Sequence, residues 1–182
     1  TAFSFRFGVL KPKDVLHLAE QHGCFPLVLA EINSTAGILP SLQCSTIPIQ
    51  PAVDIRIRGE RVAVLLPTSP KGFQALNTWL SQARPFALDP PAHLPDTHIV
   101  YPLTHCPKRR LKAHEWIGVE PEEALRASTH PEITRCLAWG TMAFRNTADY
   151  NSHRLLRSID KNTILSKLSP KEHLPNAHRW ED

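Results

Sequence analysis

The stretch LVLAEINSTAGI, residues 27–38, decides the fold that we expect for this chain. Four apolar residues lead into a single carboxylate, Glu31, and the small polar turn Asn33-Ser34-Thr35 follows shortly after it. A buried strand that carries an acid to its C-terminal tip is how many α/β enzymes place a catalytic group or a metal ligand. Glu31 is therefore the first candidate for a functional carboxylate.

Strand and helix patterns alternate on both sides of this stretch. Spacing and boundary residues predict helices over 11–23, 34–43, 69–83, 120–128 and 147–165. Runs of β-branched and apolar residues predict strands over 25–30, 98–103, 116–119 and 133–140, and a hairpin over 51–67. Residues 84–96, with four prolines, are predicted to be loop. The alternation predicts an α/β fold with a largely parallel sheet or barrel.

Two of the predicted helices carry recognisable boundary signals. Ser69 is suited to cap the helix over 69–83, because its hydroxyl can accept a hydrogen bond from the first turn. Thr147 is the predicted cap of the helix over 147–165. The residues expected to face inward on that last helix are Leu155, Leu156 and Ile159.

Composition sets the class of protein. The chain has 182 residues, 42% of them hydrophobic, which fits one large domain or a piece of a bigger one. Seventeen prolines against seven glycines predict many loops and interrupted elements. The formal charge of +4 is compatible with a polyanionic partner, but such a charge is also common in proteins that bind no nucleic acid.

The cysteines indicate a reducing compartment. Cys24, Cys44, Cys106 and Cys136 are widely spaced, without the C-x-x-C pairs of zinc knuckles and redox motifs. We expect them to be reduced, as in the cytoplasm. No apolar run is long enough to span a bilayer, so no membrane association is predicted. Because the sequence lacks an initial Met, we expect a trimmed or internal segment.

Common catalytic motifs are missing from the sequence. The ten histidines lack the close spacing of standard metal sites, although distant residues that converge in space stay an open alternative. There is no G-x-S-x-G nucleophile elbow and no glycine-rich phosphate-binding loop. The densest charge cluster consists of Lys108, Arg109, Arg110 and Lys112. It is a candidate nucleic-acid contact, and a solvated loop is the alternative.

The order of segments resembles a known family. FSFRFGVLKPKDVLHLAEQHGCFPLVLAEINSTAGI, residues 3–38, resembles the opening of the PHP (polymerase and histidinol phosphatase) domain of the bacterial DNA polymerase III alpha subunit. In this resemblance Phe3-Ser4 stands for the family's Tyr-Ser, Gly8 for its glycine, and Glu31 for the aspartate that ends its strand. The similarity continues through IQPAVDIRIRGERVAVLLPTSPKGFQALNTWLSQ, HEWIGVEPEEALR and FRNTADYNSHRLLRSIDKNTILSKL.

The resemblance implies a fold and a division of the chain. The expected fold is a PHP-type distorted (β/α) barrel that is incomplete in this fragment. Residues 1–168 would form the partial PHP-like domain, and residues 169–182 a linker or truncated continuation. Ligands of the family that lie upstream of Thr1 would have been removed with the preceding residues.

The metal-site positions of the family are altered here. An active PHP site holds two or three divalent ions with histidines and acids, according to the family pattern. The expected glutamate aligns with Arg56, and an expected Asp-x-His aligns with Thr141-Met142-Ala143. A guanidinium repels a divalent ion and does not deprotonate to bind one. We therefore expect no catalytic residue and no metal in this fragment; its vestigial positions are Glu31, Arg56, Thr141 and Ala143. We expect an ion pair or cap for Glu31, with Arg56 as the candidate partner.

The resemblance also implies a function. The fragment would be part of a cytoplasmic DNA-directed DNA polymerase, which is a nucleotidyltransferase. It would support DNA replication through its structure and its contacts with other subunits, and it would be inactive alone. Its partners would be the rest of the polymerase chain, other replisome subunits, and DNA through the full-length protein. There are two alternatives. The first is an active metal-dependent PHP phosphoesterase that holds Mn or Zn and acts as a proofreading exonuclease or as a stand-alone phosphatase. The second is a purely protein-binding module.

Overall fold

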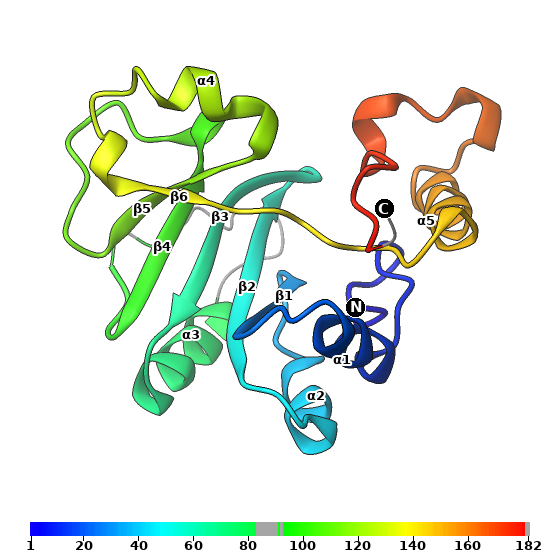
Figure 1. The fold of residues 1–182 in the computed structure, drawn as a ribbon, viewed down its shortest axis with the longest axis horizontal. Coiled ribbons are helices and arrows are strands. Elements are labelled where there is room, and N and C mark those ends of the chain that lie inside the picture. Colours follow the sequence, from blue (N-terminus) through cyan, green and yellow to red (C-terminus); the bar gives the residue numbers. More distant parts are fainter. Residues whose placement is uncertain (83–90, 92, 181–182) are drawn as a thin grey trace. The chain divides into compact units, whose positions relative to one another are not determined.

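The computed structural model of the chain describes residues 1–82, 91 and 93–180 and has a mixed α/β fold (Figure 1). The chain divides into two compact units. Unit 1 comprises Thr1–Glu31, Ala36–Gln50 and Thr141–Asp182, and unit 2 comprises Ile32–Thr35 and Pro51–Gly140. The mixed α/β class predicted from the sequence is confirmed.

Unit 2 is built on a mixed sheet. Neighbouring strands follow the order β2 (Ile49–Ile57), β3 (Glu60–Pro67), β4 (Thr97–Pro102), β5 (Glu115–Val119) and β6 (Cys136–Ala138), of which the first two residues of β2 belong to unit 1. The β2–β3 and β3–β4 pairs are antiparallel, whereas the β4–β5 and β5–β6 pairs are parallel. The prediction of a largely parallel sheet is therefore wrong for β2 to β4.

The hairpin explains why this part of the sheet is antiparallel. Arg58 and Gly59 both have positive φ, at 53° and 92°, and turn the chain directly from β2 into β3. So short a connection joins only antiparallel neighbours, because a parallel crossover needs a dozen or more residues. A register shift between Ile55 and Arg56 then places Arg56 opposite Arg61. The hairpin predicted over 51–67 is confirmed.

Alternation along the strands of unit 2 puts one set of side chains into a shared core. Ile55, Leu65, Ile99 and Ile117 are all fully buried there together with Leu76 of α3 (Pro70–Gln82). Helix α3 packs against β3 and β4, and Figure 1 shows it at one end of this part of the sheet.

Helix boundaries in unit 2 follow from two caps. The Oγ atom of Ser69 accepts a hydrogen bond from the Gly72 amide at 3.0 Å, which confirms the predicted cap of α3. In the region predicted as a helix over 120–128, a capping box between Glu120 and Glu123 opens a 3-10 turn over Pro121–Glu123. The α-helix α4 is therefore shorter than predicted and covers only Ala124–Ala127.

Unit 1 contains α1 (Pro12–Gln21), most of β1 (Leu27–Ile32), α2 (Ile38–Cys44) and α5 (Thr147–Asp160). The helix predicted over 11–23 is confirmed as α1. The strand predicted over 25–30 is displaced and covers Leu27–Ile32. Pro26 has no amide proton to donate, whereas the Leu27 amide bonds to the Pro48 carbonyl at 3.0 Å. Burial alternates along β1, and Glu31 lies on the buried side.

Helix α5 differs from its prediction at both ends. Its cap is Asn146, whose side chain accepts hydrogen bonds from the Ala148 and Asp149 amides at 3.0 and 3.1 Å, so the prediction of Thr147 is wrong. The helix ends at Asp160, because Asn162 adopts a positive φ of 49°. The prediction of residue 165 as its end is wrong.

The buried side of α5 is polar. His153, Arg157 and Ser158 are buried, whereas Leu155 and Ile159 are 53% and 55% exposed. The prediction that Leu155 and Ile159 face inward is therefore wrong. The reason is that His153 and Arg157 bond to backbone groups of unit 1, and these bonds orient the helix. In the part of the chain that the structure describes, no helix combines the length and the apolar character needed to cross a membrane.

Candidate functional site

Glu31 is the buried carboxylate of unit 1. It is 0% exposed at the end of β1, and the hydroxyl of Ser4 donates to its Oε2 atom at 2.5 Å. The hydroxyl of Thr1 donates to Oε1. Both carboxylate oxygens therefore have a hydroxyl donor, which offsets part of the cost of burying the group.

The local fold brings Ser4 and a glycine to this acid. The Ser4 carbonyl accepts hydrogen bonds from the Phe7 and Gly8 amides at 3.0 and 2.9 Å, and the turn so formed keeps Ser4 itself 4% exposed. Gly37 lies directly against the carboxylate, because a Cβ atom placed there would be 2.5 Å from Glu31 Oε1. The three residues thus form one close-packed group.

His153 is the second buried polar group of unit 1. The Leu174 amide donates to its Nε2 atom at 3.1 Å, so Nε2 is an acceptor and the ring proton lies on Nδ1. That proton is donated to the Phe7 carbonyl at 2.7 Å. The ring also packs against Phe144, with centroids 5.1 Å apart. Both nitrogens are used in backbone contacts, so this histidine acts as a structural link.

In unit 2, Arg56 lies beside a buried acid. Its Nε and Nη2 atoms donate to Asp54 Oδ2 at 3.0 and 2.8 Å, since side chains two apart on a strand share a face. Arg61 donates to the same carboxylate at 3.1 and 3.0 Å. Burial raises the pKa of Asp54, but the two guanidiniums outweigh it and hold the pKa below its usual value.

A second arginine–carboxylate pair fixes the loop between β4 and β5. Glu115 is 0% exposed and accepts two hydrogen bonds from Arg109, both at 2.7 Å, and one from the Lys112 amide at 2.7 Å. The hydrogen bonds from Arg109 lower the pKa of Glu115 to about 2 despite its burial. Burial and the neighbouring Glu115 raise the pKa of Tyr101 to about 12.

The four positions that the resemblance aligns with metal ligands fall in both units. Glu31, Thr141 and Ala143 belong to unit 1, and Arg56 belongs to unit 2. The Ala143 amide bonds to the His178 carbonyl at 3.0 Å, so the backbone of this segment is tied to the chain end. Within their own units, Glu31 is bonded to Ser4 and Arg56 to Asp54. The ion pair between Glu31 and Arg56 stays a prediction.

The side chains at these positions do not fit a divalent-metal site. They offer one strong ligand, Glu31, together with a hydroxyl, a methyl group and a guanidinium. Both oxygens of Glu31 already accept hydrogen bonds. Among the described residues, no three His, Cys, Asp or Glu side chains are grouped so that they could hold an ion. We therefore derive no chemical step through a metal.

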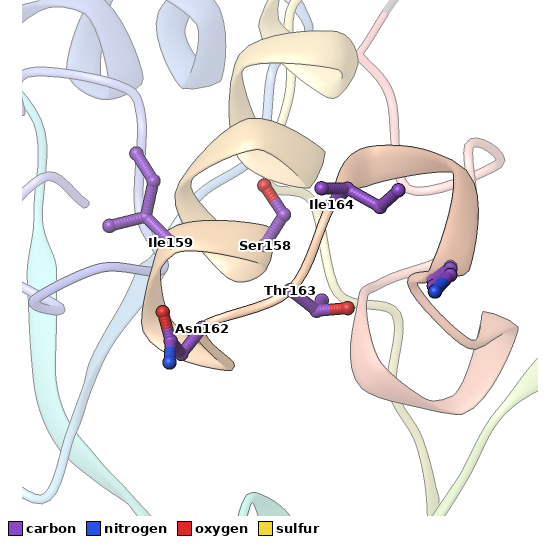
Figure 2. A pocket seen from close by; sticks show the side chains of 6 residues that line it. Ser158, Ile159, Asn162, Thr163 and Ile164 are labelled. Carbon is purple, nitrogen blue, oxygen red and sulfur yellow. The ribbon is translucent and has the colours of Figure 1, made fainter.

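Unit 1 also carries an open pocket of about 530 Å³ at the C-terminal end of α5. Figure 2 shows Ser158, Ile159, Asn162, Thr163 and Ile164 around it, and Lys167 completes the lining. These side chains include no carboxylate, imidazole or thiol, so the lining offers none of the usual metal ligands, and its one charged group is the Lys167 ammonium.

The sequence analysis missed the two paired acids, Asp54 and Glu115. For Asp54 a signal was available, because Asp54 and Arg56 alternate with apolar residues on one strand and so lie on the same face. For Glu115 the signal was weaker, since the partner Arg109 stands in a basic run that looks solvated. Comparison with known proteins adds no assignment: neither a protein-family model nor a curated protein matches the chain.

Proposed function

We propose that this chain is a PHP-like domain of a bacterial replicative DNA polymerase, the DNA polymerase III alpha subunit, whose metal site is degenerate. Its role is structural: it supports the polymerase chain and offers contacts to other replisome subunits. The polymerase carboxylates belong to another part of the full-length protein, so the chain described here is inactive by itself.

The buried group around Glu31 carries the proposal. The resemblance pairs Ser4 and Glu31 with motif positions that are 27 residues apart, and in unit 1 these two side chains are joined by a 2.5 Å hydrogen bond. A carboxylate that ends a strand and accepts from hydroxyls supports the view of a former ligand strand that now has a structural role.

Unit 2 supports the same proposal independently. At the position where the resemblance expects a glutamate ligand, Arg56 is present and its guanidinium is bound to Asp54. A cation held in place by a buried acid disfavours a divalent ion nearby. This argument uses only contacts within unit 2.

The gene product itself tests the assignment to a polymerase. An antibody raised against this chain should detect a polymerase-sized protein in the source cells, and that protein should extend a primed template. The isolated chain should incorporate no deoxynucleotide. A native product no larger than this chain, or primer extension by the isolated chain, would refute the proposal.

Measurements of bound metal and of phosphodiester hydrolysis distinguish the proposed structural domain from an active phosphoesterase. After exposure to Mn²⁺ or Zn²⁺ and desalting, the purified chain should retain much less than one ion per molecule and should not hydrolyse bis-(p-nitrophenyl) phosphate. Stoichiometric metal together with turnover, both lost in Glu31→Ala, would favour the phosphoesterase. A Glu60→Ala variant is the matched control, because Glu60 is an acid whose side chain is 80% exposed.

A further inference from the structure

The connection between β4 and β5, residues 103–114, is a basic loop held by an internal clamp. Glu115 binds the Arg109 guanidinium through two hydrogen bonds of 2.7 Å and also accepts from the Lys112 amide. A two-point arginine–carboxylate contact fixes the orientation of both groups. Lys108 and Arg110, the two neighbours of Arg109, are exposed on either side of it. The clamp therefore presents these two cations from a fixed backbone.

A flat cation–aromatic pair adjoins this loop. The Arg135 guanidinium lies 5.1 Å from the centre of the Trp116 ring and donates to the Ala113 carbonyl of the loop at 3.0 Å. The Trp116 indole nitrogen donates to His98 Nδ1 at 3.2 Å, which fixes the ring. The stacked pair and the basic loop thus form one continuous surface of unit 2, which we call the basic loop surface.

The charge of the basic loop surface is strongly unbalanced. Lys108 and Arg110 have no ion pair among the residues that the structure describes, and Glu115 is committed to Arg109. The carboxylate of Glu132 accepts from the Leu111 amide at 3.4 Å, and the Glu60 carboxylate lies 4.0 Å from His105 of the loop, so these two acids offset part of the positive charge. Cations without acid partners favour a partner that carries several negative charges.

We propose that the basic loop surface binds single-stranded nucleic acid. Lys108 and Arg110 contact phosphates, and Arg135 stacked on Trp116 offers a flat cationic group to a base, as in proteins that bind single strands without sequence preference. Arg109 is a positioning residue, because its guanidinium binds Glu115 rather than the strand. This inference goes beyond the proposed structural role and does not depend on it.

Fluorescence anisotropy with a labelled oligothymidine tests the proposal. Lys108→Glu with Arg110→Glu should weaken binding at least about tenfold and make the slope of log affinity against log salt shallower by about 1.4, since each phosphate contact on a single strand contributes roughly 0.7. The matched control is Lys161→Glu with Lys171→Glu, which makes the same charge change at exposed residues of unit 1. No binding by the unmodified chain, or equal losses in both variants, would overturn the proposal.

Two further variants separate positioning from charge. Glu115→Gln makes the chain more positive, so a purely electrostatic surface would bind the oligonucleotide more tightly, whereas loss of the clamp should weaken binding about threefold. Circular dichroism at the assay temperature confirms that the variant is folded. Arg135→Gln should weaken single-strand binding more than duplex binding. Tighter binding by Glu115→Gln would refute the role of Arg109, and preferential binding of duplex by the unmodified chain would refute the assignment to single strands.

Discussion

Unit 1 and unit 2 each bury a carboxylate, but they stabilise it differently. Glu31 of unit 1 accepts from the hydroxyls of Ser4 and Thr1 and lies 3.2 Å from the Thr1 α-amino group, whereas Asp54 of unit 2 lies between the guanidiniums of Arg56 and Arg61. Both acids therefore have a positive charge nearby, but Asp54 has two guanidiniums that each donate two hydrogen bonds, whereas two of the donors to Glu31 are neutral hydroxyls. The two sites should therefore respond differently to substitution.

The comparison also shows what a buried carboxylate requires. It needs hydrogen-bonding or charged partners, because an unpaired buried charge costs several kcal/mol. Unit 2 provides arginines, and unit 1 provides hydroxyls, the Thr1 α-amino group and a glycine that leaves room for the acid. In both units, the acid serves the fold through its contacts.

The largest effect is expected for Asp54→Ala. This change leaves Arg56 and Arg61, whose side chains are only 10% and 19% exposed, beside each other without their shared acid. We expect a loss of about 3 to 5 kcal/mol in the free energy of unfolding, measured by urea denaturation. The control Glu60→Ala should change it by less than about 0.5 kcal/mol. If Asp54→Ala and Glu60→Ala lower the free energy of unfolding equally, the buried ion pairs of Asp54 do not stabilise this hairpin.

Glu31→Ala should have the next largest effect. It leaves a cavity and removes the acceptor of the Ser4 hydroxyl, so we expect a loss of about 2 to 3 kcal/mol and a lower melting temperature, with unchanged metal content. Glu31→Gln keeps the shape and one acceptor, and should lose less. An unchanged melting temperature in Glu31→Ala would show that the acid is not structural.

Acid should destabilise the chain through Glu115. Its pKa is lowered from 4.5 to about 2 on folding, so its stabilisation is complete above pH 4.5 and is lost as the pH falls from 4.5 towards 2. The loss from this group is on the order of 2 kcal/mol. Across this range, the free energy of unfolding of Glu115→Gln should depend less steeply on pH than that of the unmodified chain. Some dependence remains in the variant, because the pKa values of Asp54 and Asp149 are also lowered. Identical slopes in the two proteins would contradict this role of Glu115.

The smallest effect concerns the space beside Glu31. Gly37→Ala places a methyl group within 2.5 Å of Glu31 Oε1, and a fully buried side chain has little freedom to move away. We expect a loss of about 1 to 2 kcal/mol. Gly140→Ala is the control, since its methyl group would meet nothing within 4 Å. If both variants melt at the same temperature, Glu31 is less tightly packed than we infer.

Local patterns were sufficient to predict much of the fold. The hairpin turn at Arg58-Gly59, helix α1 and the Ser69 cap follow from residues close together in the sequence. Such signals depend on backbone preferences and on short-range hydrogen bonds, which a sequence records directly.

The errors arose where distant contacts override a local pattern. Helix α5 has apolar residues at helical spacing, yet its buried side is set by His153 and Arg157, which bond to backbone groups of Phe7, Leu174 and Glu172. Glu31 was identified from the sequence as the key acid. Its partner Ser4 was quoted as part of a motif, but the hydrogen bond between them depends on how the chain folds back, which no local signal encodes.

Anomalous diffraction from crystals soaked in Mn²⁺ tests the central claim most directly. If the metal site is degenerate, the anomalous map will contain no peak within coordination distance of the Glu31 carboxylate, and Ser4 will remain its hydrogen-bond donor. A manganese peak coordinated by Glu31 together with other side chains of this chain would contradict the account.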